Sequence, residues 1–175
     1  MQSFTKVLFA AFCAVFALFF AACESEVNID KIDTSKPFKL EIFKGKSVKI
    51  QVSENAIVSS VKKPAVYSFF ASWCASCKVE AQILSNLREK FGEKVQIIGV
   101  LMEDLNAQEV EKFKAEFGIN YDIAVGAGNL IFDKALNNTF GVPLIVVADA
   151  QGRILLRHSG VVDGTRLQSL LDGLL

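Results

Sequence analysis

The chain has 175 residues, of which 51% are hydrophobic and 22% are charged, which excludes an intrinsically disordered protein and fits one ordinary domain. Its 19 Lys and Arg residues balance 19 Asp and Glu residues, so the composition gives no sign of a surface that binds nucleic acid. Four cysteines are too few for a small fold held together by disulfide bonds.

The first 22 residues are far more apolar than the rest of the chain. They hold six of the 15 Phe residues and a single charge, Lys6. The uncharged run from Val7 to Ala22 is shorter than the roughly 20 residues of a membrane-spanning helix, and it follows a basic residue, as the apolar region of a secretory signal does. We therefore interpret residues 1–22 as a signal peptide, with an uncleaved N-terminal membrane anchor as the alternative.

The end of this run, Phe20-Ala21-Ala22-Cys23, resembles the lipobox of bacterial lipoproteins. The resemblance implies cleavage before Cys23 and attachment of lipid to that cysteine, because two or three acyl chains hold a protein firmly to a membrane. Residues 23–36 are polar and predict a tether, and residues 37–175 predict the folded domain. We expect this domain to lie at the periplasmic face of a bacterial membrane.

Strands alternate with helices through the folded domain. Alternating apolar residues at 38–42 and 48–52 predict an N-terminal β-hairpin, and the apolar run 65–71 predicts a central strand that is covered on both faces. The other expected elements are a helix from Cys74 to Gly92, a strand at 95–101, a helix ending at Gly118, a strand at 121–125, a helix at 130–136, a hairpin of strands 144–148 and 154–157, and a helix from Asp163. This order predicts an α/β fold with a central mixed sheet flanked by helices.

The helix that begins at Cys74 carries apolar residues at steps of three and four. We expect these residues to form its buried face: Val79, Ile83, Leu84, Leu87 and Phe91.

Two cysteines lie where the central strand becomes this helix, in Ser72-Trp73-Cys74-Ala75-Ser76-Cys77. At a helix N-terminus, free backbone N–H groups and the helix dipole favour the thiolate of Cys74, which is the form that attacks disulfides. Cys77 lies one turn further along the same helix face and can resolve a mixed disulfide. So small a loop gains little stability from a disulfide, which favours a redox function for the pair over a structural one.

The Trp-Cys-x-x-Cys motif after an apolar strand, with Gly141-Val142-Pro143 far downstream, resembles the thioredoxin fold. In more detail, residues 37–175 resemble the membrane-tethered TlpA/ResA group of thiol–disulfide oxidoreductases. The resemblance implies a cis peptide bond before Pro143, which would lie beside the active-site sulfurs. It also implies that the backbone of Val142 pairs with a substrate strand and that Trp73 flanks the exposed sulfur.

The same group often has a glutamate three residues after the second cysteine, where this chain has Glu80. The resemblance implies that Glu80 takes and returns the proton of Cys77 during resolution. The alternative is that Glu80 lies on a solvated helix face. Two positions depart from related proteins: Ser68 replaces the buried aspartate of thioredoxins, and Gln82 replaces a proline that kinks the helix.

These observations predict a reductase of protein disulfides that needs no cofactor and no metal. By resemblance, its substrates would be apocytochrome c or copper-site proteins, and a membrane electron donor of the thiol-relay type would recycle it. We expect a monomer that does not bind nucleic acid. The alternatives are a periplasmic disulfide oxidant, and a binding protein such as a copper chaperone or a tethered holdase, because soft thiolates also select Cu(I).

Overall fold

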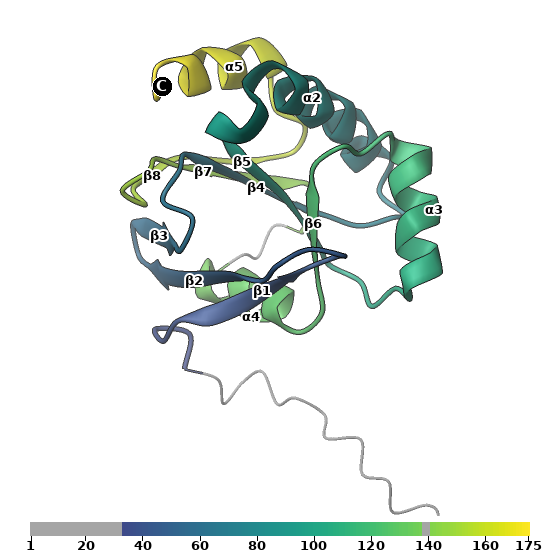
Figure 1. The fold of residues 1–175 in the computed structure, drawn as a ribbon, viewed down its shortest axis with the longest axis horizontal. Helices are drawn as coiled ribbons and strands as arrows, with labels where there is room; N and C mark the ends of the chain where they lie inside the picture. Colours follow the sequence, from purple (N-terminus) through teal and green to yellow (C-terminus); the bar gives the residue numbers. More distant parts are fainter. Residues whose placement is uncertain (1–32, 138–140) are drawn as a thin grey trace, which may run out of the picture.

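A computed structural model describes residues 33–137 and 141–175 (Figure 1). The elements in chain order are β1 (Phe38–Ile42), β2 (Val48–Ser53), β3 (Ala56–Ser59), β4 (Ala65–Phe70), α2 (Ala75–Phe91), the short 3-10 helix η2 (Gly92–Lys94), β5 (Gln96–Leu101), α3 (Ala107–Phe117), β6 (Asp122–Val125), α4 (Gly128–Ala135), β7 (Leu144–Ala148), β8 (Ile154–Ser159) and α5 (Gly164–Asp172). The predicted signal peptide, the predicted lipidation site Cys23 and most of the predicted tether lie outside the described residues. Within the described ranges, every helix is too short or too polar to cross a bilayer.

All eight strands form one sheet in the order β3-β2-β1-β6-β5-β4-β7-β8. Strands β4, β5 and β6 are parallel, whereas β1 joins β6 and β7 joins β4 in antiparallel pairs. The predicted mixed sheet and α/β architecture are therefore confirmed. Strand β4 lies between β5 and β7, and this interior position explains why its residues form a nearly unbroken apolar run.

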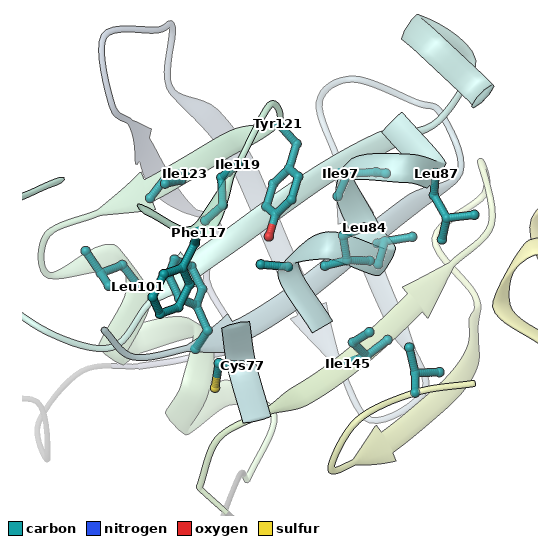
Figure 2. Packing of buried hydrophobic residues seen from close by; sticks show 14 of the residues in the cluster. Cys77, Leu84, Leu87, Ile97, Leu101, Phe117, Ile119, Tyr121, Ile123 and Ile145 are labelled. Atoms are coloured by element: carbon teal, nitrogen blue, oxygen red, sulfur yellow. The ribbon is translucent and has the colours of Figure 1, made fainter. Parts of the chain in front are cut away.

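The two faces of the sheet bury two separate cores, because successive side chains of a strand point to opposite faces. From β4, Val66 and Phe70 pack with α2, α3 and α5, whereas Tyr67 and Phe69 pack with α4 and the N-terminal strands. Figure 1 shows α2 and α5 together on one face and α4 beside β1 and β2 on the other. The first core includes Cys74 and Cys77, and Figure 2 shows Cys77 in this cluster, so the site lies directly against packed side chains.

The N-terminal hairpin of the prediction is extended by a third strand, β3, which the sequence analysis did not predict. Four residues with a serine at the last position give too short an apolar pattern to indicate a strand. The structure forms it because β3 has partners on both sides: β2 pairs with it, and the Ile57 N–H donates to the carbonyl of Gly152 at 2.7 Å. The Ile154 N–H also donates to the carbonyl of Asn55 at 3.0 Å, so the turn between β7 and β8 lies against β3.

The predicted buried face of α2 is wrong at Val79, which is 56% exposed. The buried stripe runs through Cys77, Glu80, Leu84, Leu87 and Phe91. Val79 lies two residues from Cys77, about 200° around the helix, and therefore faces solvent. The prediction failed because a glutamate, which an apolar pattern does not count, occupies the buried position.

Candidate active site

Cys74 and Cys77 form a disulfide at the start of α2, with their Cα atoms 5.2 Å apart. Strand β4 ends at Phe70, and Cys74 is the N-cap of the helix with an extended backbone. The Cys77 N–H donates to the sulfur of Cys74 at 3.1 Å. The predicted position of Cys74 at a helix N-terminus is confirmed, and in the reduced protein the same N–H group and the helix dipole would stabilise a thiolate there.

The resemblance implied an exposed sulfur at Cys74, but this residue is buried in the oxidised protein. Cys74 is 6% exposed and Cys77 is 2% exposed. In the disulfide, the Cys74 sulfur is turned toward Cys77 and also lies 3.3 Å from the hydroxyl of Ser76, and these contacts limit its access to solvent. The neighbouring Trp73 is 75% exposed, so a large apolar side chain next to the disulfide is accessible to solvent.

Glu80 is buried on the sheet-facing side of α2, three residues after Cys77. It is 1% exposed, and its Oε1 accepts a hydrogen bond of 2.7 Å from the hydroxyl of Ser68 on β4. The alternative of a solvated helix face is therefore wrong. Burial raises the pKa of Glu80 to about 7, while hydrogen bonds from Ser68 and from the Val162 backbone partly oppose this rise.

The peptide bond between Val142 and Pro143 is cis, as the resemblance implied. Pro143 directly precedes β7, and in the antiparallel pair of β4 and β7 Leu144 lies opposite Phe69. Because β4 leads into the cysteine motif, Pro143 lies at the same edge of the sheet as Cys74. Val142 is half-buried and packs against both cores.

Two polar contacts of the site were missed by the sequence analysis. Ser68 was noted only as a departure from thioredoxins, although a serine inside an apolar strand was a usable signal for a buried polar partner. Glu103 lies after β5, and its carboxylate accepts hydrogen bonds from the backbone and hydroxyl of Ser72. Nothing in the sequence marks Glu103, because the contact depends on β4 and β5 being parallel neighbours.

The described part of the chain, residues 33–137 and 141–175, contains no group of three His, Cys, Asp or Glu side chains that could hold a metal ion. The described site residues are a pair of cysteines, one buried carboxyl group and an exposed aromatic ring. Such a set can exchange disulfides and move a proton.

Comparison with curated proteins finds thiol–disulfide relatives. The chain is 39% identical over 104 residues to the thiol:disulfide interchange protein DsbE of Pseudomonas fluorescens biotype C, which covers 58% of this chain and 54% of that protein. It is 24% identical over 152 residues to the thioredoxin-like protein YneN of Bacillus subtilis, covering 85% of this chain and 83% of the relative. The chain spans about half the length of the DsbE proteins that it matches.

Among solved structures, a DsbF homologue from Corynebacterium diphtheriae superposes with a TM-score of 0.63 at 22% identity, covering 80% of this chain and 85% of that one. At this identity the likeness is one of fold. The family model described as Redoxin matches residues 33–174, which is nearly all of the described chain. With a thioredoxin-like fold and a Cys-x-x-Cys pair at a helix N-terminus, this chain belongs to the Redoxin family.

Proposed function

We propose that this protein is an extracytoplasmic thiol–disulfide oxidoreductase that reduces disulfides in partner proteins. One observation carries the proposal: Cys74 caps the N-terminus of α2, and Cys77 is joined to it from the next turn of the same helix. The relatives named as thiol:disulfide interchange proteins support the same reaction class.

In the proposed reaction, Cys74 attacks the partner disulfide first and Cys77 then resolves the mixed disulfide. In the reduced protein, the Cys74 thiolate attacks one sulfur of a partner disulfide, which forms a mixed disulfide and releases the other partner sulfur as a thiolate. Cys77 loses its proton and attacks the Cys74 sulfur, which releases the second partner thiolate. Two electrons pass to the partner, and Cys74 and Cys77 end as the disulfide that the structure contains. The dithiol carries both electrons, so the proposal requires no cofactor.

Glu80 is the proposed proton carrier for the second step. Glu80 and Cys77 are three residues apart and share the buried face of α2. A carboxyl group with a pKa of about 7 is partly charged at neutral pH, so it can accept the proton of Cys77 and return it to a product thiolate.

The proposed substrate surface surrounds the disulfide. Trp73 offers an exposed apolar ring, and Val142 and Pro143 lie at the same edge of the sheet. An extended segment of a partner protein could pair there with the backbone of Val142, in the manner of an added strand. Apocytochrome c and copper-site proteins are the proposed partners, by the resemblance to the tethered group.

The proposed location is the periplasmic face of a membrane, with a lipid on Cys23 after removal of residues 1–22. An uncleaved N-terminal anchor would give the same location. A membrane electron donor of the thiol-relay type would then return electrons to the Cys74–Cys77 disulfide, and the protein would act as a monomer.

The direction of electron flow is tested by the reduction potential of the Cys74–Cys77 pair in the full chain. A reductase requires a value near or below about −250 mV, whereas a value near about −120 mV would make the protein an oxidant and overturn the reductase proposal.

The reaction itself is tested by trapping. In the Cys77→Ala variant, resolution is impossible, so partner proteins should accumulate as mixed disulfides through Cys74 in the membranes of the native cell. These adducts should disappear on reduction with dithiothreitol, and the Cys74→Ala/Cys77→Ala double variant should form none. If the single variant forms no adducts, the enzyme proposal fails and a binding function gains weight.

A further inference from the structure

Glu103 holds the loop that carries the active-site cysteines. One oxygen of its carboxylate accepts the backbone N–H of Ser72, and the other accepts the Ser72 hydroxyl at 2.8 Å. Glu103 is half-buried, whereas the next residue, Asp104, is exposed. Two hydrogen bonds from one residue to one carboxylate fix both its position and its orientation, and bonds to a charged acceptor are the stronger kind.

The parallel pairing of β4 and β5 brings the two residues together. Phe70 lies opposite Leu101 at the ends of these strands, and the Met102 N–H donates to the carbonyl of Phe70 at 2.9 Å. This bond carries the pairing one residue beyond the strands. Glu103 is therefore the first residue after the paired segments, at the edge of the sheet where Ser72 follows β4.

Ser72 occupies the middle of the turn that delivers Cys74 to the helix. The Cys74 N–H donates to the carbonyl of Ala71 at 3.2 Å, which closes a four-residue turn over Ser72 and Trp73. The next contact along the chain is the bond from the Cys77 N–H to the Cys74 sulfur at 3.1 Å. A shift of the turn would therefore move the sulfur away from the N-terminal N–H groups of α2.

We propose that Glu103 is a positioning residue which, through Ser72, keeps the turn at residues 71–74 in place so that the Cys74 sulfur remains at the N-cap of α2. This inference rests on the proposed thiol–disulfide function, because it concerns the nucleophile of that reaction. Glu103 acts on the geometry of Cys74 and takes no part in the transfer of electrons or protons.

Removal of Glu103 would change the Cys74 pKa in opposite directions, depending on whether Glu103 acts by positioning the turn or only by charge repulsion. A carboxylate near a thiol disfavours the thiolate, so removal of its charge alone would lower the Cys74 pKa and speed alkylation at neutral pH. Loss of positioning instead removes the Cys74 thiolate from its N–H donor, which raises the pKa and slows alkylation. The charged groups of α2 near the cysteines, Lys78 and Glu80, are the same in every variant compared.

The experiment measures iodoacetamide alkylation of Cys74 against pH in the reduced full chain, followed by mass spectrometry of the peptide that contains Cys74. We expect Glu103→Ala to slow alkylation at pH 7 by about 3- to 10-fold, since one pKa unit corresponds to a tenfold change in thiolate fraction. Glu103→Gln keeps a carbonyl oxygen that can accept the Ser72 N–H, so its rate should stay within about twofold of the unchanged protein. Asp104→Asn is the matched control and should leave the rate unchanged.

A further variant and a second measurement distinguish a loss of positioning from a general folding defect. Ser72→Ala removes only the hydroxyl bond and should slow alkylation by less than Glu103→Ala does. Trp73 is the single tryptophan, so its fluorescence spectrum reports directly on the turn and should change in Glu103→Ala but not in Asp104→Asn. Equal or faster alkylation in both Glu103 variants would overturn the inference.

The two proposals fail in different ways. If the unchanged protein cannot reduce a model protein disulfide such as that of insulin, the proposed function fails, whatever the alkylation rates. If it reduces insulin and the Glu103 variants alkylate as it does, only the positioning role is lost.

Discussion

Ser68 on β4 donates its hydroxyl hydrogen to the carboxylate of Glu80 on α2, and the two oxygens lie 2.7 Å apart inside the protein. Both residues are almost fully buried, and within the described residues the second carboxylate oxygen of Glu80 has no hydrogen-bond partner. A charged carboxylate in this position lacks much of the hydration that it has in water. Burial therefore outweighs the opposing effect of the hydrogen bonds from Ser68 and from the Val162 backbone, and it raises the Glu80 pKa from 4.5 to about 7.

We predict that Glu80→Gln removes a loss of stability that the unchanged protein undergoes as the pH rises from about 4.5 to about 7. The folded protein keeps the Glu80 proton up to a pH of about 7, whereas the unfolded chain releases it near 4.5. The folded state thus binds more protons in this window, so the free energy of unfolding falls as the pH rises through it. A shift of this size corresponds to at most roughly 3 kcal/mol.

The measurement is urea unfolding of the oxidised full chain at a series of pH values between 4 and 8. Glu80→Gln should flatten the fall between pH 4.5 and 7 and should be more stable than the unchanged protein at pH 8. A matched surface variant, Glu89→Gln on the exposed face of the same helix, should leave the fall intact. An identical pH dependence for Glu80→Gln and the unchanged protein would contradict the raised pKa.

We expect Ser68→Ala to raise the Glu80 pKa further, because the hydroxyl stabilises the charged carboxylate. A hydrogen bond to a charged group contributes about 1.5–3 kcal/mol, so the variant should lose stability mainly above neutral pH. The carboxyl carbon of Glu80, followed by NMR through a pH titration, reports the pKa directly. Ser85 is on the same helix as Glu80, and its hydroxyl donates to the carbonyl of Gly118 at the end of α3, so Ser85→Ala should leave the Glu80 titration unchanged.

The sequence was sufficient for the parts of the site that depend on local pattern. An apolar run followed by Trp-Cys-x-x-Cys placed Cys74 at the junction of a strand and a helix, and the structure has it there. Contacts between distant elements could not be predicted in this way. The pairing of Glu103 with Ser72 depends on which strands are neighbours, and Val79 was misplaced because the buried stripe of α2 includes the polar residue Glu80.

The edge strand β3 shows the same limit in the fold. The short strand β3 forms because a glycine in the turn between β7 and β8 approaches it closely. Gly152 has a φ of +92°, and a Cβ atom there would lie 2.9 Å from the carbonyl oxygen of Ile57. No apolar pattern encodes such a contact.

We predict that Gly152→Ala destabilises the protein more than Gly160→Ala. Both glycines have positive φ angles, +92° and +88°, so each alanine carries a backbone cost of about 1–2 kcal/mol. A Cβ atom at Gly160 would meet nothing within 4 Å, whereas at Gly152 it would press on the backbone of β3. The overlap should add about 1 kcal/mol or more to the loss in Gly152→Ala, measured by urea unfolding. Equal losses in the two variants would show that β3 can move away without cost.

The last prediction concerns the core on the face of the sheet away from the cysteines. Phe132 of α4 is fully buried, and its ring meets those of Tyr67 at 5.0 Å and Phe69 at 5.1 Å between centroids. Phe132→Ala should cost about 3–5 kcal/mol in the free energy of unfolding, because it removes a large ring from a packed site. Leu130→Ala on the same helix should cost far less, since Leu130 is 42% exposed.

A milder variant at the same position, Phe132→Leu, separates the effect on stability from the effect on the redox chemistry. Because the sheet lies between Phe132 and the core that holds Cys77, Phe132→Leu should lower stability while leaving the reduction potential of the Cys74–Cys77 pair unchanged. Unfolding in urea and equilibration with a dithiothreitol redox buffer measure the two quantities on one sample. A potential that shifts together with stability would mean that the α4 face is coupled to the disulfide through β4, which supplies residues to both cores.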